Sequence, residues 1–216
     1  MSLVQKLAVW ALPVLFAITL HEVAHGWVAR AFGDHTAEEQ GRLSLNPLRH
    51  IDPIGTIIVP ALLLFLGGFL FGWAKPVPVD PRRMHHPRRD MAIVAAAGPA
   101  ANLAMAVGWA VVARLGFALL EHWAWAAVPM ILMGQAGIAI NLILMVLNLL
   151  PLPPLDGGRI LAGVVPPRVA YHLAQIEPYG LMVLVVLLAL GWLGRLLSPP
   201  YTALYELITR MFGLNL

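Results

Sequence analysis

Hydrophobic residues along this chain gather in long runs that are separated by short polar segments. Three runs are long and continuous enough to predict membrane-spanning helices, over residues 3–32, 91–120 and 126–150, and a fourth span is expected over residues 179–197. A helix needs about 20 mainly apolar residues to cross the hydrocarbon core of a bilayer. The pattern therefore predicts an all-α polytopic membrane protein with four transmembrane helices.

Composition agrees with this class and narrows the possible chemistry. Of the 216 residues, 60% are hydrophobic and 12% are charged, and the mean hydropathy is +0.79. We expect a single membrane domain over residues 1–216, with a core at 3–165 and a C-terminal span and surface helix within 177–212. The chain has no cysteine, which excludes disulfides and thiolate metal sites. Histidine, aspartate and glutamate remain as candidate metal ligands.

The motif His21-Glu22-Val23-Ala24-His25 lies near the end of the first predicted helix. Residues four apart share one face of a helix, so the two imidazoles can bind the same zinc ion. The glutamate between them can act as a general base. The motif is short, and a hydrogen-bonded histidine pair near a helix end is the alternative interpretation. Ionisable groups beside lipid are costly, however, which favours a functional role.

A catalytic zinc ion usually has three protein ligands, and Asp156 is the candidate for the third. It stands in the apolar segment 148–159, where three prolines and two glycines interrupt the helix. Irregular backbone at membrane depth is tolerated only where it is buried in protein or lines a cavity. The alternative role for Asp156 is to cap the short helix that follows it.

Three motifs in order give the chain a family resemblance. They are His21-Glu22-x-x-His25, then Gly98-Pro99-x-x-Asn102, then Asn148-x-x-Pro151 followed by Leu155-Asp156-Gly157-Gly158. Together they resemble the site-2 protease family of intramembrane zinc metalloproteases, peptidase family M50. Many members carry a PDZ domain between the second and third core spans. Only residues 121–125 occupy that place here, so the chain resembles a minimal member without a PDZ domain.

The resemblance implies roles for particular residues. His21, His25 and Asp156 would bind one zinc ion per chain, and Glu22 would be the catalytic acid-base. Two further residues, Asn102 and Asn148, would lie near the active site, with Asn148 in contact with the substrate backbone.

The activity implied by the resemblance is zinc-dependent hydrolysis of a peptide bond in or near a transmembrane helix of a partner protein. Single-span membrane proteins are the expected substrates and the lipid bilayer is the expected surroundings, with no nucleic-acid partner. A metal or proton transporter using the same ligands is one alternative, but a transport pathway would spread charged groups through the spans. An inactive protease-like scaffold is the other alternative, and the intact Glu22 argues against it.

Residues 73–79 have prolines at two alternate positions. This spacing is incompatible with a helix and suits an edge strand. Because proline has no N–H, only the side that carries Lys75, Val77 and Val79 can donate hydrogen bonds to a partner. We predict that an unwound substrate pairs with this side of the strand. The alternative is a proline-rich connector without a binding role.

The apolar run at residues 54–73 contains a proline and a glycine pair, and we predict that it enters the membrane and returns, as a helix or as a hairpin. If it crossed, His25 and Asp156 would lie near opposite faces of a core about 30 Å thick. Ligands of one zinc ion each lie about 2 Å from it, so the run must return for the site to form.

The basic residues agree with this topology. Re-entry places ten on one face, namely Arg30, Arg42, Arg49, Lys75, Arg82, Arg83, Arg88, Arg89, Arg159 and Arg168, and four on the other, namely Lys6, Arg114, Arg195 and Arg210. The richer face is expected to be cytoplasmic. We therefore expect a multi-pass protein of a bacterial cytoplasmic membrane, with both termini outside and a zinc site within the membrane toward the cytoplasmic side.

Overall fold

The structure, a computed structural model, describes residues 2–58 and 75–214 of the chain. All of its regular elements are helices, and no strand occurs in the described residues. The longer helices are α1 (Leu3–Ala31), α4 (Pro87–Leu119), α5 (Ala124–Asn148), α7 (Pro167–Ala189) and α8 (Trp192–Met211). The shorter ones are α2 (Thr36–Glu39), α6 (Asp156–Val164), the 3₁₀ helices η1 (Pro47–His50) and η3 (Pro81–Arg83), and the π-helix η2 (Pro53–Ile58).

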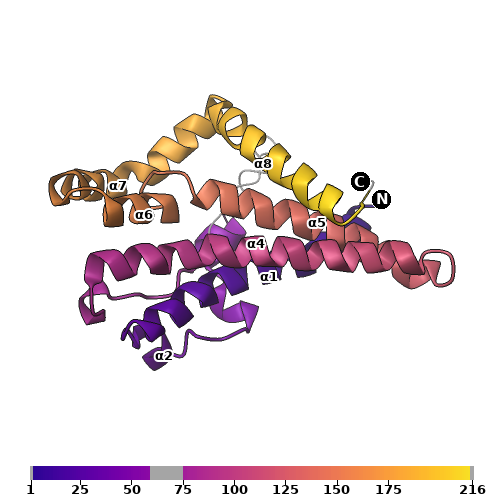
Figure 1. The fold of residues 1–216 in the computed structure, drawn as a ribbon, viewed down its shortest axis with the longest axis horizontal. Coiled ribbons are helices and arrows are strands. Elements are labelled where there is room, and N and C mark those ends of the chain that lie inside the picture. The colour runs from indigo at the N-terminus through magenta and orange to yellow at the C-terminus, as the bar shows by residue number, and fades with distance from the viewer. Residues whose placement is uncertain (1, 59–74, 215–216) are drawn as a thin grey trace.

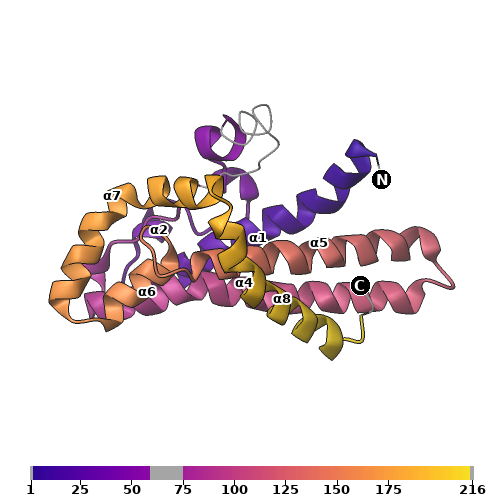
Figure 2. The same cartoon turned by 90° about the horizontal axis from the view of Figure 1, so that it is seen from above.

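Four helices, α1, α4, α5 and α7, are long and apolar enough to cross a membrane. This confirms the predicted number of candidate spans. Helices α1, α4 and α5 pack together, with α4 antiparallel to its neighbours, so that α1 and α5 run in the same direction (Figures 1 and 2). The C-terminal end of α1 therefore lies at the same end of the bundle as the C-terminal end of α5 and as α6.

The fourth predicted span has different bounds in the structure. Instead of one helix over residues 179–197, α7 begins at Pro167 and ends at Ala189, and α8 follows after Gly191. Proline is tolerated at the first position of a helix because an N–H group there has no partner within the helix, so its absence breaks no hydrogen bond. Gly191 has a φ of +69°, the left-handed conformation that ends many helices.

Small side chains allow α4 and α5 to approach each other closely. Ala106, Ala110 and Ala113 of α4 are fully buried against Ile138 and Leu142 of α5. Lipid is as apolar as these side chains, so helices in a membrane associate mainly through such close packing and through interhelical hydrogen bonds.

The C-terminal helix α8 packs against this core. Ile208 is buried in the same cluster, and Leu204 and Tyr205 pack against it, so α8 crosses over α5 (Figure 2). The placement of this helix on a membrane surface stays a prediction.

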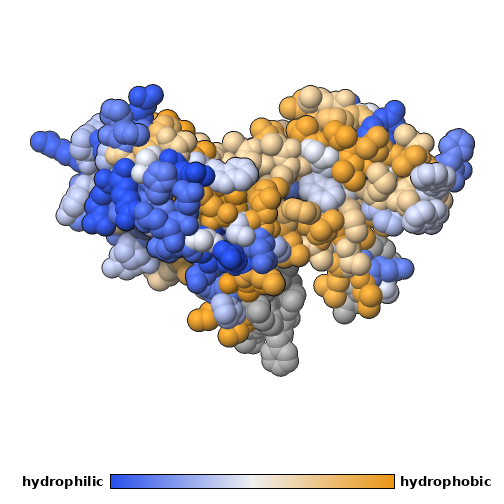
Figure 3. Space-filling model, turned by 90° about the horizontal axis from the view of Figure 1, so that it is seen from below, coloured by the Kyte–Doolittle hydropathy of each residue, from blue (hydrophilic) through white to orange (hydrophobic). Residues whose placement is uncertain are grey.

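Polar segments are concentrated at the end of the bundle that carries α2 and α6. Seen from below in Figure 3, hydrophilic residues cover this end, and most of the remaining visible face is hydrophobic. The carboxylate of the buried Asp34 holds the loops together there, because it accepts hydrogen bonds from the N–H groups of Thr36 and Asp80. Lys75 donates a backbone hydrogen bond of 2.9 Å to the carbonyl of His50. The predicted re-entrant run 54–73 begins within the described residues, but its remainder, from residue 59, lies outside them.

The α4–α5 contact predicts the effect of one added methyl group. A Cβ at Gly134 would lie 2.6 Å from Cβ of Ala113 and 2.9 Å from its backbone nitrogen. We expect Gly134→Ala to lower the free energy of unfolding by about 1–3 kcal/mol, which is the usual effect of overpacking. Thermal unfolding of the purified protein in detergent measures this. Gly194→Ala is the control, since a Cβ there meets nothing within 4 Å, and equal melting temperatures for the two variants would contradict the prediction.

Candidate metal centre

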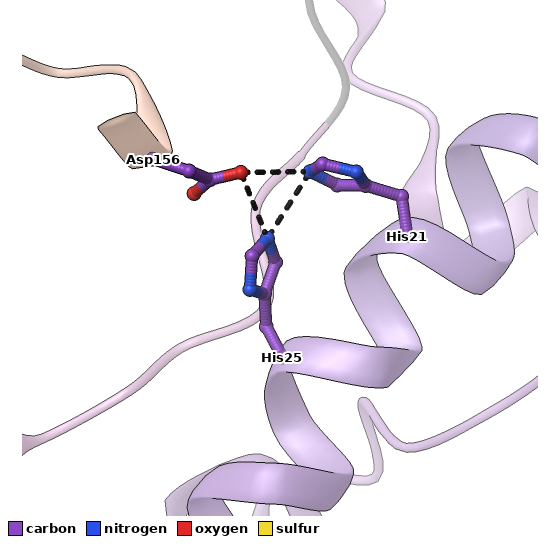
Figure 4. Close-up of side chains that lie close together, drawn as sticks. All are labelled: His21, His25 and Asp156. Atoms are coloured by element: carbon purple, nitrogen blue, oxygen red, sulfur yellow. Dashed lines mark hydrogen bonds and ion pairs between the residues drawn. The ribbon is translucent and has the colours of Figure 1, made fainter. Parts of the chain in front are cut away.

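The structure brings His21, His25 and Asp156 together (Figure 4). The two histidines lie one turn apart on α1, and the aspartate is the first residue of α6. Nε2 of His21 lies 3.1 Å from Nε2 of His25 and 3.2 Å from Oδ2 of Asp156, and the distance from His25 Nε2 to the same oxygen is 3.4 Å. The side chains of all three residues are largely buried.

These distances fit a zinc site. In a tetrahedral site with bonds of about 2.0 Å, the ligand atoms lie about 3.3 Å from one another. The three measured separations, 3.1–3.4 Å, surround that value. Oδ2 of Asp156 is buried, and no described group gives it a well-aligned hydrogen bond. Two imidazoles and one carboxylate are also a ligand set that catalytic zinc sites use.

Each imidazole is oriented through its other nitrogen. Nδ1 of His21 lies 2.6 Å from Oδ1 of Asn102, and Nδ1 of His25 lies 2.8 Å from the backbone carbonyl of Val94. Both acceptors belong to α4. Such partners fix the ring orientation and leave Nε2 free to bind a metal.

Gly98 provides the space for the two rings. A Cβ built on it would collide with Nε2 of His25 and would lie 2.5 Å from Cε1 of His21. The glycine of the Gly98-Pro99-x-x-Asn102 motif therefore allows α4 to lie directly against the imidazoles, while the asparagine of the same motif contacts His21.

The turn before α6 also depends on glycine. A Cβ on Gly157 would collide with the carbonyl oxygens of Leu149 and Leu150, and a Cβ on Gly158 would collide with the nitrogen of Pro153. The segment after α5 thus folds tightly back over these glycines and places Asp156 opposite α1.

Glu22 lies beside the three candidate ligands but does not belong to that group. Its Oε2 atom accepts a hydrogen bond of 2.8 Å from the backbone N–H of Val77. The Val77 side chain is buried and lies against α1 at Gly26, where a Cβ would be 3.0 Å from Cγ1 of the valine. The segment that contains Val77 therefore crosses α1 at the candidate catalytic residue.

The predicted substrate strand has partners within the chain. Val77 donates its N–H to Glu22, and Lys75 donates its own to His50. Residues 75–80 have no regular secondary structure, and residues 73 and 74 lie outside the described part of the chain. The roles predicted for Lys75, Val77 and Val79 stay predictions.

Asn148 is half-buried at the end of α5, and its amide donates to the carbonyl of Leu144. Its contact with substrate stays a prediction. Three contacts of the site were not predicted. The carbonyl of Val94, which orients His25, and the N–H of Val77, which binds Glu22, are backbone groups that the sequence does not distinguish. Asn141, which binds Asn102, stands out in the sequence as a polar residue within an apolar span.

The position of Gly98 leads to a prediction about metal binding. We expect Gly98→Ala to weaken zinc binding at least about 10-fold, because the added methyl group displaces both imidazoles. Zinc titration against a competing chelator measures the affinity. Gly108→Ala on the same helix is the matched control, since a Cβ there meets nothing within 4 Å. Equal zinc affinity in the two variants would show that Gly98 does not shape the site.

Comparisons with known proteins find similarity to zinc metalloproteases. The family model of peptidase family M50 matches residues 118–191. The chain is 40% identical over 208 residues to "Putative zinc metalloprotease YwhC" of Bacillus subtilis, across 93% of this chain and 89% of that protein. It is 34% identical over 181 residues to Rip2 of Mycolicibacterium smegmatis, which has the same description, across 84% of this chain and 66% of the relative. It is also 35% identical over 173 residues to Rip2 of Mycobacterium tuberculosis H37Rv, across 80% of this chain and 63% of the relative.

No solved structure matches the chain. The relative from Bacillus subtilis, however, is matched over nearly the whole length of both proteins, and the family model covers the segment with Asn148 and Asp156. The chain therefore belongs to peptidase family M50, the site-2 protease family of zinc metalloproteases.

Proposed function

We propose that this metalloprotease hydrolyses a peptide bond in or near a transmembrane helix of a single-span membrane protein. The observation that carries the proposal is the arrangement of His21, His25 and Asp156, whose ligand atoms lie 3.1–3.4 Å apart beside Glu22. The two histidines belong to α1, which is long and apolar enough to span a membrane. A membrane protein is therefore the kind of substrate that can reach this site most directly.

In the proposed hydrolysis, the metal and the side chains of the protein supply different parts of the chemistry. When bound, a zinc ion supplies Lewis-acid chemistry, which lowers the pKa of water and polarises a carbonyl group. Glu22 takes a proton from the attacking water and delivers it to the leaving amine nitrogen. The water oxygen becomes bonded to the carbonyl carbon as the C–N bond breaks. Val77 holds Oε2 of Glu22 through its N–H, which leaves the other carboxylate oxygen for proton transfer.

The distribution of charge supports a protease over a transporter. No charged residue lies between Asp90 and Arg114 in α4, and α5 has none at all. A transport pathway needs polar or ionisable groups at successive depths. Within the helices α1, α4 and α5, the buried side chains of His21, Asn102 and Asn141 are instead linked to one another at a single site.

We also propose that the run 54–73 re-enters the membrane without crossing it, so that the site faces the cytoplasm. The hydrogen bond between Lys75 and His50 supports this, because it joins the two ends of the segment. The two ends of a crossing segment would lie about 30 Å apart. The excess of arginine and lysine at this end supports the cytoplasmic orientation.

The first test separates metal binding from catalysis. We expect His21→Ala and Asp156→Ala to lose zinc affinity, because each removes a ligand. We expect Glu22→Gln to retain zinc and to lose about 10²–10⁴-fold in cleavage rate, because the amide cannot accept the proton. Metal analysis of the purified variants and cleavage of co-expressed single-span membrane proteins provide the measurements. Full zinc occupancy in both ligand variants would refute the assignment of the site.

A second test concerns substrate binding along the segment at Val77. We expect Val77→Pro to abolish cleavage, because it removes the N–H that holds Glu22. Val77→Ala keeps the N–H and is the matched control, expected to retain most of the activity. Cleavage of one substrate by both variants is the measurement, and an active Val77→Pro protein would disprove the role of the segment.

A third test addresses topology. The side chains of Glu39 and Arg83 form an ion pair of 2.7 Å, so single cysteines at these positions should react with a membrane-impermeant maleimide from the same side. The chain has no native cysteine to interfere. Glu121→Cys, in the turn between α4 and α5, is the control that should react from the opposite side. Labelling of Glu39→Cys and Arg83→Cys from opposite sides would overturn the proposed topology.

A further inference from the structure

Asn141 is fully buried in the middle of α5, a helix made almost entirely of apolar residues. Its amide nitrogen donates a hydrogen bond of 2.8 Å to the carbonyl of Gly137, and its amide oxygen accepts one of 2.9 Å from Nδ2 of Asn102. A backbone carbonyl can only accept. The amide nitrogen of Asn141 must therefore face Gly137, and its oxygen must face Asn102.

The orientation of Asn102 follows from the same reasoning. Its amide nitrogen has two acceptors, Oδ1 of Asn141 at 2.9 Å and the carbonyl of Ala17 on α1 at 3.2 Å. Both hydrogens of this nitrogen are thus used, and the amide oxygen faces Nδ1 of His21 at 2.6 Å. An amide oxygen only accepts, so Nδ1 of His21 must carry the hydrogen.

This proton position decides whether His21 can bind a metal. A neutral imidazole with its hydrogen on Nδ1 has its lone pair on Nε2, and Nε2 is the atom that faces His25 and Asp156. A reversed Asn102 amide would present its NH₂ group to Nδ1, and the hydrogen would then occupy Nε2 and block coordination.

From this arrangement we infer that Asn141 is a positioning residue of the metal centre. It orients Asn102, which in turn holds His21 in the tautomer that binds zinc. The inference rests on the proposed zinc site. It applies to His21 alone. His25 is oriented directly by the backbone carbonyl of Val94, which only accepts hydrogen bonds and, unlike an asparagine amide, cannot turn a donor toward the ring.

The test measures zinc affinity by chelator competition on the full-length protein in detergent. Asn141→Leu has a similar volume and no polar group. Asn141→Ser can bond the carbonyl of Gly137 but is too short to reach Asn102. Both variants should bind zinc about 10-fold to 100-fold more weakly than the wild type.

The matched control is Gln135→Leu. Gln135 is also an amide residue on α5, and the structure gives it no bond to Asn102. Its replacement should leave the zinc affinity unchanged, even though it also exchanges an amide side chain for leucine on the same helix.

A double-mutant cycle shows whether Asn141 acts through Asn102. In an Asn102→Ala background, Asn141→Leu should weaken zinc binding less than 3-fold further, because the connection to His21 is already lost. A general loss of stability would make the two effects additive. The tautomer gives a second readout. In ¹⁵N spectra of histidine-labelled, metal-free protein at pH 8, Asn141→Leu should shift the His21 signals away from the Nδ1–H form and leave those of His25 unchanged.

The outcomes separate this inference from the proposed function. Wild-type protein that binds zinc independently of His21 would refute the site itself. If zinc binding depends on His21 but Asn141→Leu and Asn141→Ser bind it as tightly as the wild type, only the inference fails. Additive effects in the cycle, or unchanged His21 signals in Asn141→Leu, would likewise overturn it.

Discussion

The close approach of three side chains, those of the candidate metal ligands, constrains most of this fold. Three side-chain atoms lie within 3.4 Å of one another, although two come from α1 and the third from α6. Such a meeting requires α1 and α5 to run in the same direction and to end together. Helix α4 provides the return between them, and the segment that connects α1 to α4 has to begin and end at the site. The hydrogen bond from Lys75 to His50 and the loops joined at Asp34 satisfy this requirement.

Close approach of helices is the second requirement, and small residues meet it. Gly98 leaves room for the imidazoles, and Gly134 allows α5 to contact Ala113 of α4. Gly157 allows the backbone after α5 to fold back on itself. In a membrane, where burial from water does not hold helices together, these contacts and the hydrogen bonds between helices supply the cohesion. Asn102 on α4 and Asn141 on α5 form a hydrogen bond between closely packed helices, and this pair lies next to His21.

The site combines rigid and less regular parts. The candidate ligands and their partners belong to helices or to the first turn of one, and this fixes their orientation. The carboxylate of Glu22 is instead held by the backbone of a segment without regular structure, through Val77.

The sequence by itself determined the class of the protein, the number of candidate spans and the residues of the candidate metal centre. These follow from local rules, namely run length for the spans, helical periodicity for His21 and His25, and an isolated acid in a broken helix for Asp156. The predicted fourth span began at residue 179, whereas α7 begins at Pro167, because proline is well tolerated at the first position of a helix. Only the tertiary structure decided the partners across helices, such as Val94 for His25, Val77 for Glu22 and Asn141 for Asn102. Two of these three contacts involve backbone groups, which every residue carries, and all three join residues whose proximity depends on how the helices pack.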